Sequence, residues 1–313
     1  MNKAVALPRE PSREALANPV KRYFLATRPA FLTITLAGCL LGMATASTFH
    51  WGLAGLTLLL AVAAHAGINV LNDFYDHLNG TDAVNTDRLF PFTGGSRFIQ
   101  NGVLSPAQTL AWGLALFALV IAGGLWLMQQ TGPQLFWIGL AGLLIGWAYS
   151  APPLRLNSRG LGEACVAGGF LLIVAGSACV QGAGLVAGAW LIGLPYALLV
   201  TNILYINQFP DRKADALAGK RHWVVRMQPA VAARGYVLIL LLAASLLIFT
   251  VFARLLPSLA LISLVGLAPA ISAARRLLAN VDEPSQLMPA IKSTIAAAHL
   301  QPLLLAAVLW GTR

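Results

Sequence analysis

The chain contains 313 residues, of which 58% are hydrophobic and 10% are charged, and its formal net charge at pH 7 is +10. Soluble globular domains carry about 25% charged residues, so this composition excludes a water-soluble domain and makes lipid the main solvent of the surface. The positive charge is typical of proteins that bind nucleic acid or a membrane surface. The distribution of the charges favours membrane lipid as the partner and no nucleic acid.

Long apolar segments alternate with polar connections along the chain. Residues 1–28 are polar and basic and are interpreted as an N-terminal segment outside the membrane. A helix needs about 20 mostly apolar residues to cross the hydrocarbon layer. This criterion predicts spans near residues 29–48, 52–76, 106–128, 134–151, 160–180, 185–209, 230–252, 258–274 and 290–310. Residues 29–313 are therefore predicted to form a single transmembrane domain, an all-α bundle of about nine helices.

The Lys and Arg residues are distributed unequally between the two sides of the membrane. With the N-terminus inside and nine crossings, all but Arg254 and Arg313 of the 21 lie in the N-terminal segment, in the even-numbered connections or beside them. Cytoplasmic loops carry an excess of Lys and Arg. The sequence therefore predicts a multi-pass protein of the cell inner (cytoplasmic) membrane, with its N-terminus in the cytoplasm.

All 11 acidic residues fall on the same predicted side as the cations. The positive-inside bias applies to Lys and Arg, so it does not explain why the carboxylates lie on the same side. Carboxylates clustered beside cations at one end of a helical bundle indicate a site for metal ions and anions. Surface solvation is the simpler explanation for Glu10, Glu14, Asp282 and Glu283.

A first acidic motif ends the second span. It places Asn69, Asn72, Asp73 and Asp76 at a spacing that puts all four side chains on one face of a helix. Asp73 and Asp76 lie about one turn apart, close enough to share a divalent cation. Oxygen ligands of this kind suit Mg²⁺, which binds through one or two carboxylates together with phosphate oxygens and water.

A second acidic motif, with Asn207, Asp211 and Asp215, ends the sixth span. Pro210 removes a helical hydrogen bond, so we expect a kink or a restart of the helix there. A single Asp near a helix end is more often a solvated terminus than a ligand. Two matching constellations beside membrane spans are interpreted as functional. They predict two pseudo-repeats, with motifs at 69–76 and 207–215, that face one shared cavity.

The two carboxylate pairs would repel each other unless cations lay between them. A diphosphate bridged by Mg²⁺ would neutralise both pairs, and a membrane cavity suits a substrate whose apolar tail stays in lipid. Six cations are candidates for binding the remaining phosphate charge: Arg97, Arg155, Arg159, Lys213, Lys220 and Arg221.

Two further features have open interpretations. The segment Thr93–Arg97 contains adjacent glycines and is either a plain turn or a phosphate cradle, because glycine lets backbone N–H groups approach an anion. Tyr149, at the end of the fourth span, is either an interfacial aromatic residue or part of the site.

These motifs resemble a known family. The pattern N-x-x-N-D-x-x-D at 69–76, D-x-x-x-D at 211–215 and the nine-span layout are similar to the UbiA superfamily of intramembrane prenyltransferases. The segments 80–82, 91–96, 149–155, 159–163 and 219–221 look most like the 1,4-dihydroxy-2-naphthoate prenyltransferases of menaquinone synthesis. Many members carry a third acidic residue at the position of Gly80, whereas this chain has Asp82.

The resemblance implies a UbiA-like bundle around a central cavity, with cap loops and the active site on the cytoplasmic side. Mg²⁺ bound by Asp73, Asp76, Asp211 and Asp215 would hold a polyprenyl diphosphate, whose ionisation gives an allylic cation. The aromatic acceptor attacks this cation, and in the naphthoate branch loss of CO₂ gives a demethylmenaquinone. The implied supporting residues are Tyr149 beside the cation and Asn69, Asn72, Asn207, Arg97, Arg155 and Lys220 around the diphosphate.

Two alternatives remain open at the level of the sequence. The first is the same fold with another acceptor: 4-hydroxybenzoate, haem, a chlorophyll precursor or a lipid glycerol ether. The second is an ion-coupled secondary transporter, because repeated halves with membrane carboxylates also describe carriers. Carriers place such carboxylates near the bilayer midplane, whereas these motifs end their spans. The sequence makes no prediction of the oligomeric state.

Overall fold

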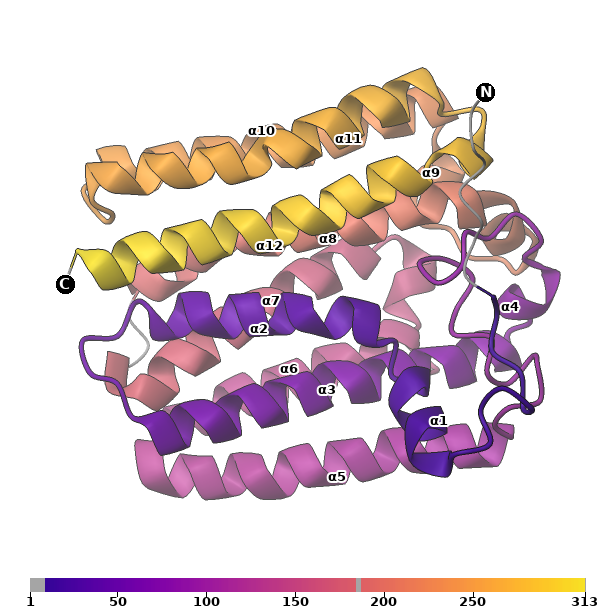
Figure 1. Cartoon of the computed structure of the whole chain (residues 1–313), viewed down its shortest axis with the longest axis horizontal. Coiled ribbons are helices and arrows are strands. Elements are labelled where there is room, and N and C mark those ends of the chain that lie inside the picture. The colour runs from indigo at the N-terminus through magenta and orange to yellow at the C-terminus, as the bar shows by residue number, and fades with distance from the viewer. Residues whose placement is uncertain (1–8, 184–186, 313) are drawn as a thin grey trace.

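The computed structural model describes residues 9–183 and 187–312, and within these residues every regular element is helical. The predictions for residues 1–8, for the start of the span at 185–209 and for Arg313 lie outside the described residues. The helices that run along the bundle are α2 (Pro29–Met43), α3 (Trp51–Leu78), α5 (Pro106–Thr131), α6 (Gln134–Ser150), α7 (Gly162–Ala178), α8 (Ala187–Leu217), α10 (Pro229–Phe252), α11 (Ala268–Ala279) and α12 (Met288–Gly311). They lie side by side along the long axis of the molecule (Figure 1).

Short helical elements connect the long ones. They are α1 (Pro19–Ala26), α4 (Thr81–Val84) and α9 (Trp223–Arg226), the 3₁₀ turns η1 (Leu156–Arg159), η3 (Ser258–Leu267) and η4 (Pro284–Gln286), and the π-helical turn η2 (Cys179–Ala183). Local sequence sets several boundaries. Ser105 caps α5 through a capping box with Gln108, and Pro106 occupies the first turn, where its missing N–H costs nothing. Gly80 ends α3 with a left-handed backbone, φ +81°, which turns the chain into α4.

The predicted multi-pass, all-α fold is confirmed. In the described residues, seven helical segments are long and apolar enough to cross a membrane, and an eighth is added if α1 and α2, bent by 63°, count as one span. The helix α6 is apolar but shorter. Each predicted span overlaps a helix, but the count of nine crossings stays a prediction.

The long helices form a ring around the bundle axis. Each of α2, α3, α5, α6, α7, α8, α10, α11 and α12 contacts the next, and α12 returns to α2. Contacts between α2 and α7 and between α8 and α12 cross the middle of the ring. The ring is thereby divided into a half built on α3, α5, α6 and α7 and a half built on α10, α11 and α12, with α8 between them.

The α10–α12 half contains the largest apolar core. Buried tyrosines tie it together: Tyr205 on α8 donates a hydrogen bond to the Ala232 carbonyl of α10 (2.9 Å), and the Tyr236 hydroxyl lies 2.8 Å from that of Thr294 on α12. A third, Tyr196, donates to the Ile34 carbonyl on α2 (2.8 Å). Polar tips that would be costly to bury alone are thus satisfied.

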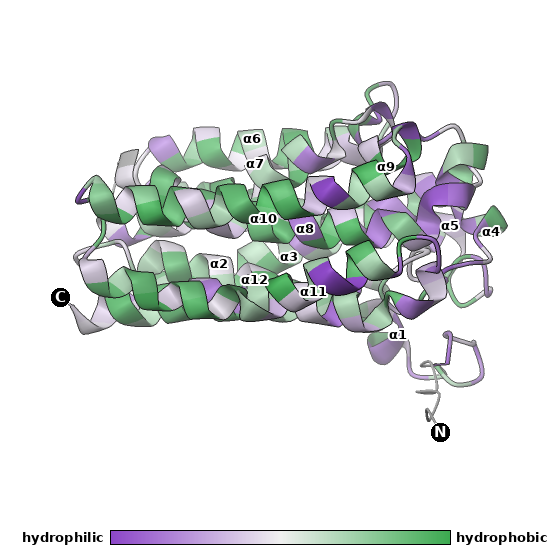
Figure 2. Ribbon diagram, turned by 90° about the horizontal axis from the view of Figure 1, so that it is seen from above, coloured by the Kyte–Doolittle hydropathy of each residue, from purple (hydrophilic) through white to green (hydrophobic). Residues whose placement is uncertain are grey.

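One end of the bundle carries the polar connections. Residues 79–105, 151–161 and 218–228, together called the cap below, join α3 to α5, α6 to α7 and α8 to α10. Hydrophilic residues gather at this end, where α4 and α9 lie, while the helices between the ends are mostly apolar (Figure 2). This arrangement agrees with the predicted concentration of charge on one side.

Residues 9–17, called the N-terminal strap below, are bound to the cap. Glu10 forms an ion pair with Arg88 (2.6 Å) and accepts a hydrogen bond from Asn101 (3.2 Å), while Leu16 packs against the buried Phe98. The interpretation of Glu10 as a freely solvated surface residue is therefore wrong. Burial alone would raise the pKa of Glu10, but the hydrogen bonds from Asn101 and Arg88 outweigh it and hold the pKa below 4.5.

The opposite end of the bundle is held by a buried amide. Gln181, in the π-helical turn after α7, is fully buried, and its side chain accepts from the His50 amide (2.6 Å) and donates to the His50 carbonyl (3.4 Å). The Thr48 hydroxyl donates to the Gln181 carbonyl (2.7 Å). These bonds fasten the end of α7 to the turn between α2 and α3.

Candidate functional site

A cavity of about 610 Å³ lies among α2, α3, α5, α6, α7 and α8 and is closed at one end by the cap. Its charged and amide side chains gather at the cap end, and the rest of its wall is mainly apolar, with the exceptions of Thr57, His65 and Ser177. The polar residues at the cap end include Asn69, Asn72, Asp76, Tyr149, Asn207, Asp211, Asp215 and Lys220, all predicted from the sequence, together with Arg28, Asp82, Asn85 and His222, which were not among the predicted site residues.

The α3 motif is divided between the cavity and the cap. Asp76 lines the cavity and accepts hydrogen bonds from Asn72 (3.3 Å) and Asn79 (3.2 Å). Asp73 is buried behind the wall and accepts the backbone N–H of Ser96 (3.3 Å). Asn69 donates to the Thr27 carbonyl at the bend before α2 (3.0 Å). The four residues share one helical face, as predicted.

The α8 motif faces the same cavity. Asp211 accepts the side chain of Asn85 (2.6 Å) and the backbone N–H of Gly94 (3.2 Å). His222 lies 2.9 Å from the Asp215 carboxylate. Helix α8 continues through Pro210 to Leu217, so the helix does not restart there, and Asp211 and Asp215 lie about one turn apart on the same helix.

Lys220 joins the two motifs. Its ammonium lies 2.9 Å from Asp76 and 3.4 Å from Asp215, and it is almost fully buried. Burial alone would lower the pKa of Lys220, but the two carboxylates outweigh burial and raise it, so this lysine is charged at neutral pH. The two distant acidic motifs therefore meet in one pocket around a fixed positive charge.

The glycine loop connects the motifs from the cap side. Gly94 and Gly95 both have left-handed backbones, with φ of +75° and +73°, and both line the cavity. The N–H groups of Gly94 and Ser96 donate to Asp211 of α8 and Asp73 of α3. A Cβ on Gly95 would lie 2.6 Å from the Asp82 carboxylate, so only glycine fits there. The loop is more than a plain turn, since it bonds both carboxylate helices.

Asp82 is a residue of the site that the sequence indicated only weakly. It lies on α4, lines the cavity and accepts a hydrogen bond from Gln100 (3.2 Å). Burial, followed by the charges of Asp76 and Asp73, raises the pKa of Asp82 well above its usual value. Its displacement from the family's usual third acidic position is the only pattern that points to it, and no pattern points to Asn85 or His222.

Of the six candidate cations, Lys220 alone lines the cavity. The Arg97 guanidinium donates to the backbone carbonyl of Asp82 and lies 3.9 Å from Glu10, within the cap. Lys213 is exposed and pairs with Asp87 (2.9 Å). The other three line a separate pocket of the cap: Arg155, Arg159 and Arg221. The polar end of the cavity also contains Arg28, which was not predicted.

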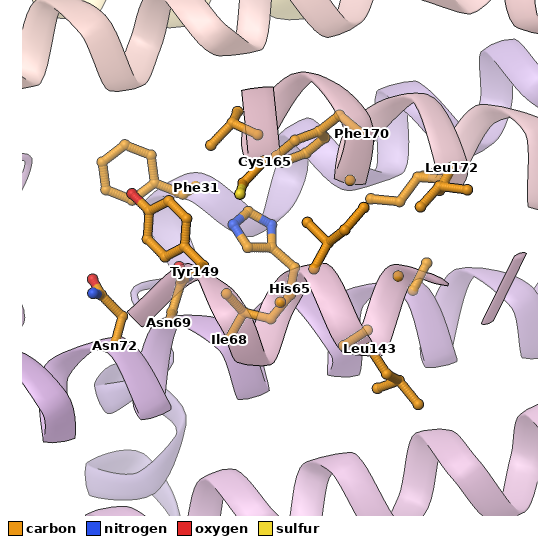
Figure 3. A pocket seen from close by; sticks show the side chains of 18 of the residues that line it. Phe31, His65, Ile68, Asn69, Asn72, Leu143, Tyr149, Cys165, Phe170 and Leu172 are labelled. Atoms are coloured by element: carbon orange, nitrogen blue, oxygen red, sulfur yellow. The ribbon is translucent and has the colours of Figure 1, made fainter. Parts of the chain in front are cut away.

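The apolar part of the cavity extends away from the cap. Along α3 it reaches from Asp76 to Thr57, about 28 Å at the usual helical rise. Tyr149 stands between the polar and apolar parts, with its ring near Phe31 and with Asn69 and His65 close by (Figure 3). The His65 Nδ1 lies 2.7 Å from the Thr35 hydroxyl, and its ring packs edge-on against Phe170.

The donor set of the polar end suits Mg²⁺. Among the described residues, no three His, Cys, Asp or Glu side chains converge in a closed metal-binding group. Mg²⁺ does not require one, because it binds through one or two carboxylates and takes its other ligands from phosphate and water. The carboxylates of Asp76, Asp211 and Asp215 face the cavity, and buried side-chain oxygens of Asn85 and Asn207 lack hydrogen-bond partners.

Comparisons with known proteins agree with this geometry. Residues 31–292 match the UbiA prenyltransferase family. The 1,4-dihydroxy-2-naphthoate octaprenyltransferase of Haemophilus influenzae is 29% identical over 251 residues, which cover 75% of this chain and 78% of that enzyme. The Bacillus subtilis enzyme of the same name is 27% identical over 210 residues, which span 64% of each chain, just under two thirds.

More distant similarities extend the comparison. The chloroplastic chlorophyll synthase of Arabidopsis thaliana is 27% identical over 204 residues, covering 62% of this chain and 50% of that enzyme. A UbiA homologue from Archaeoglobus fulgidus, solved with GPP and Mg²⁺, superposes with a TM-score of 0.62 at 16% identity, over 92% of this chain and 99% of that one. At that identity the superposition shows the fold. The family match covers most of the sequence, and the chain therefore belongs to the UbiA prenyltransferase family and is a membrane-embedded prenyltransferase.

Proposed function

We propose that the protein transfers a polyprenyl group from a polyprenyl diphosphate to 1,4-dihydroxy-2-naphthoate and releases diphosphate. The observation that carries this proposal is the position of Lys220 between Asp76 and Asp215, at the polar head of a cavity whose remaining wall is apolar. A charged head and a long hydrocarbon tail on one substrate match the two parts of this cavity.

The polar end of the cavity, beside the cap, would bind the diphosphate. Asp76, Asp211 and Asp215, with Asp73 behind them, would hold Mg²⁺, and the unpartnered amide oxygens of the site would assist. When bound, Mg²⁺ supplies positive charge that neutralises the diphosphate oxygens as the carbon–oxygen bond breaks. Lys220 is charged and already in place, so it stabilises the charge on the leaving diphosphate without rearrangement.

Tyr149 and Arg28 would orient the two reacting groups. The Tyr149 ring lies between the polar head and the apolar tail region, where the allylic cation forms, and an aromatic face attracts a cation. Arg28 lines the cavity, and its buried Nε has no hydrogen-bond partner, so it is available to the carboxylate of the acceptor. The acceptor ring forms the new carbon–carbon bond, and loss of CO₂ restores its aromaticity.

The naphthoate acceptor is favoured by the motifs of the cap and by the similarity to two enzymes named for it. The similarity to a chlorophyll synthase supports the alternative of a chlorophyll precursor as acceptor. A transporter is not proposed, because the chain belongs to a prenyltransferase family and its paired carboxylates lie near the ends of α3 and α8 that join the cap.

We further propose that the protein resides in the cytoplasmic membrane, with the cap and the N-terminus facing the cytoplasm. The support is the strong excess of Lys and Arg in the N-terminal segment and the cap. The active site would then open toward the compartment that supplies a water-soluble aromatic acid.

The acceptor is tested with purified protein, Mg²⁺ and one radiolabelled polyprenyl diphosphate, offered 1,4-dihydroxy-2-naphthoate, 4-hydroxybenzoate or chlorophyllide. We expect prenylated product with the naphthoate alone. Product with another acceptor and none with naphthoate would overturn the proposed acceptor while leaving the reaction class intact. Failure to release diphosphate with any of these acceptors, in protein that is folded by size-exclusion chromatography, would contradict the whole scheme.

A further inference from the structure

A second pocket, of about 330 Å³, lies in the cap and shares no lining residue with the central cavity. It is formed where the segments after α3 and α8 meet the turn η1 and the end of α9. Its polar lining consists of four arginines with an amide and a hydroxyl: Arg155, Arg159, Arg221, Arg226, Asn79 and Ser158. No acidic side chain of the described residues lines it.

Two of the arginine side chains are bonded to backbone carbonyls, and none is paired with a carboxylate. Arg159 donates to the Pro153 carbonyl (2.8 Å), and Arg226 donates to the Arg159 carbonyl (2.9 Å). The backbone N–H of Arg221 donates to the Ser158 carbonyl (2.7 Å), which joins the segment after α8 to the segment after α6. Within the described residues, none of the four forms an ion pair. All four are exposed, so water and salt screen their mutual repulsion, and an anion bound among them would remove the rest.

The general excess of cations on one side of the membrane does not account for this pocket. That bias acts on the number of Lys and Arg residues in a loop, and exposed pairs such as Arg275 and Arg276 on α11, which line neither pocket, satisfy it equally well. Here the arginines come from two connections far apart in the sequence and surround one concave surface. Arginine presents a planar fork of donors that matches phosphate oxygens.

The pocket is also a neighbour of the catalytic head. Asn79, in its wall, donates to Asp76 (3.2 Å), and Gly219, also in its wall, directly precedes Lys220. One layer of residues therefore separates the two hollows. We propose that this pocket binds a phosphate-bearing anion, either free diphosphate or the phosphodiester headgroup of an anionic lipid. This proposal does not depend on which acceptor the enzyme uses.

The test measures binding of radiolabelled inorganic diphosphate to the full chain in phosphatidylcholine nanodiscs with excess EDTA. Chelation removes the divalent ions that the carboxylates of the central cavity need to hold diphosphate, so the arginine pocket is observed alone. We expect saturable binding near one equivalent. In the double variant Arg221→Gln/Arg226→Gln, the affinity should fall at least tenfold, and Arg155→Gln alone should lower it severalfold. The matched control Arg275→Gln/Arg276→Gln removes the same charge elsewhere and should bind as the wild type does.

A second arm distinguishes the two sources of the anion. If nanodiscs that contain phosphatidylglycerol abolish diphosphate binding to the wild type, the pocket takes a lipid headgroup; if binding is unchanged, it takes the free anion. Both outcomes support an anion site. Absence of saturable binding in phosphatidylcholine, or equal affinity in the pocket variant and the α11 control, would overturn the proposal. None of these readouts uses prenyl transfer, so a failure here leaves the proposed function untouched.

Discussion

The half of the bundle built on α3, α5, α6 and α7 surrounds the central cavity, whereas the half built on α10, α11 and α12 contributes none of the described residues that line it. The two halves are made of similarly apolar helices. They differ in what occupies the space between the helices. In the first half, residues such as Gly139 and Gly142 on α6 leave open space beside the backbone. In the second, side chains such as Tyr236 and Leu277 fill it completely.

This difference separates the roles of the two halves. The close-packed half supplies the packing energy that stabilises the bundle. The half around the cavity can therefore leave space unfilled without unfolding the protein. Helix α8 belongs to both halves. Its Asn207 and Asp211 face the cavity, while Ile206 and Phe209 are buried in the apolar core. The close-packed α10–α12 half thus positions the acidic motif of α8 directly.

The largest expected effect lies at the head of the cavity. Asp76→Asn or Asp211→Asn keeps the shape of the side chain and removes a charge that faces the diphosphate, so kcat should fall about 100-fold or more, the range seen when an electrostatic catalytic group is removed. Turnover of labelled prenyl diphosphate measures it. The control is Glu283→Gln, on an exposed turn outside both pockets, which should keep near-normal turnover. Near-normal activity in either Asp variant would contradict the metal-bridging role.

The next effect contrasts the stability of the two halves. Leu277→Ala on α11 removes a fully buried side chain and should destabilise the protein by about 2–5 kcal/mol. Leu143→Ala on α6 makes the same chemical change in the wall of the cavity, where one side of the leucine already faces open space, and should cost less than half as much. Unfolding midpoints in one detergent measure both. Equal costs would show that the two halves are equally well packed.

A smaller effect concerns the chain length of the prenyl diphosphate that the cavity accepts. A Cβ at Gly142 would meet no atom within 4 Å and would point into the cavity, so Gly142→Phe fills part of the apolar region. We expect kcat/KM for long prenyl diphosphates to fall about tenfold while short ones are retained, because a few lost apolar contacts are worth that much. Gly55→Phe on α3 is the control, since Gly55 also has free space but does not line the cavity. A uniform loss for all chain lengths would contradict this view of the cavity.

The smallest effect concerns the N-terminal strap. A carboxyl whose pKa is lowered on folding stabilises the folded state above its unfolded pKa, and this stabilisation is lost as the pH falls through the lowered value. Since the pKa of Glu10 is held below its usual value by its hydrogen bonds to Asn101 and Arg88, the strap should be bound at neutral pH and released in acidic solution. Glu10→Gln should loosen it at pH 7 at a cost of about 1 kcal/mol or less.

Hydrogen exchange of residues 9–17 as a function of pH measures this release. The exposed Glu14 provides the matched control, because Glu14→Gln removes the same charge from the same segment. If both variants exchange at the wild-type rate, the ion pair with Arg88 does not hold the strap.

The helices and the faces of both acidic motifs could be predicted because they depend on local spacing. The contacts that complete the site could not, since they are made by loops. Lys220 reaches Asp76 only because the segment after α8 folds back over the cavity. Arg97 and Arg155 were expected to reach the diphosphate, but each has a left-handed backbone, with φ of +66° and +43°, and neither lines the cavity. Sequence spacing within a loop does not reveal that backbone conformation.

The buried amide of Gln181 has a consequence for the route by which the hydrophobic product leaves the cavity. The helices cannot separate at that end without breaking hydrogen bonds that are buried away from water. We therefore expect a hydrophobic product to leave laterally, between two helices and into the bilayer. Helices α5 and α6 both line the cavity with exposed apolar side chains, so we expect the tail to pass into the bilayer between these two helices. These side chains are Ile121 and Leu125 on α5 and Phe136 and Leu140 on α6.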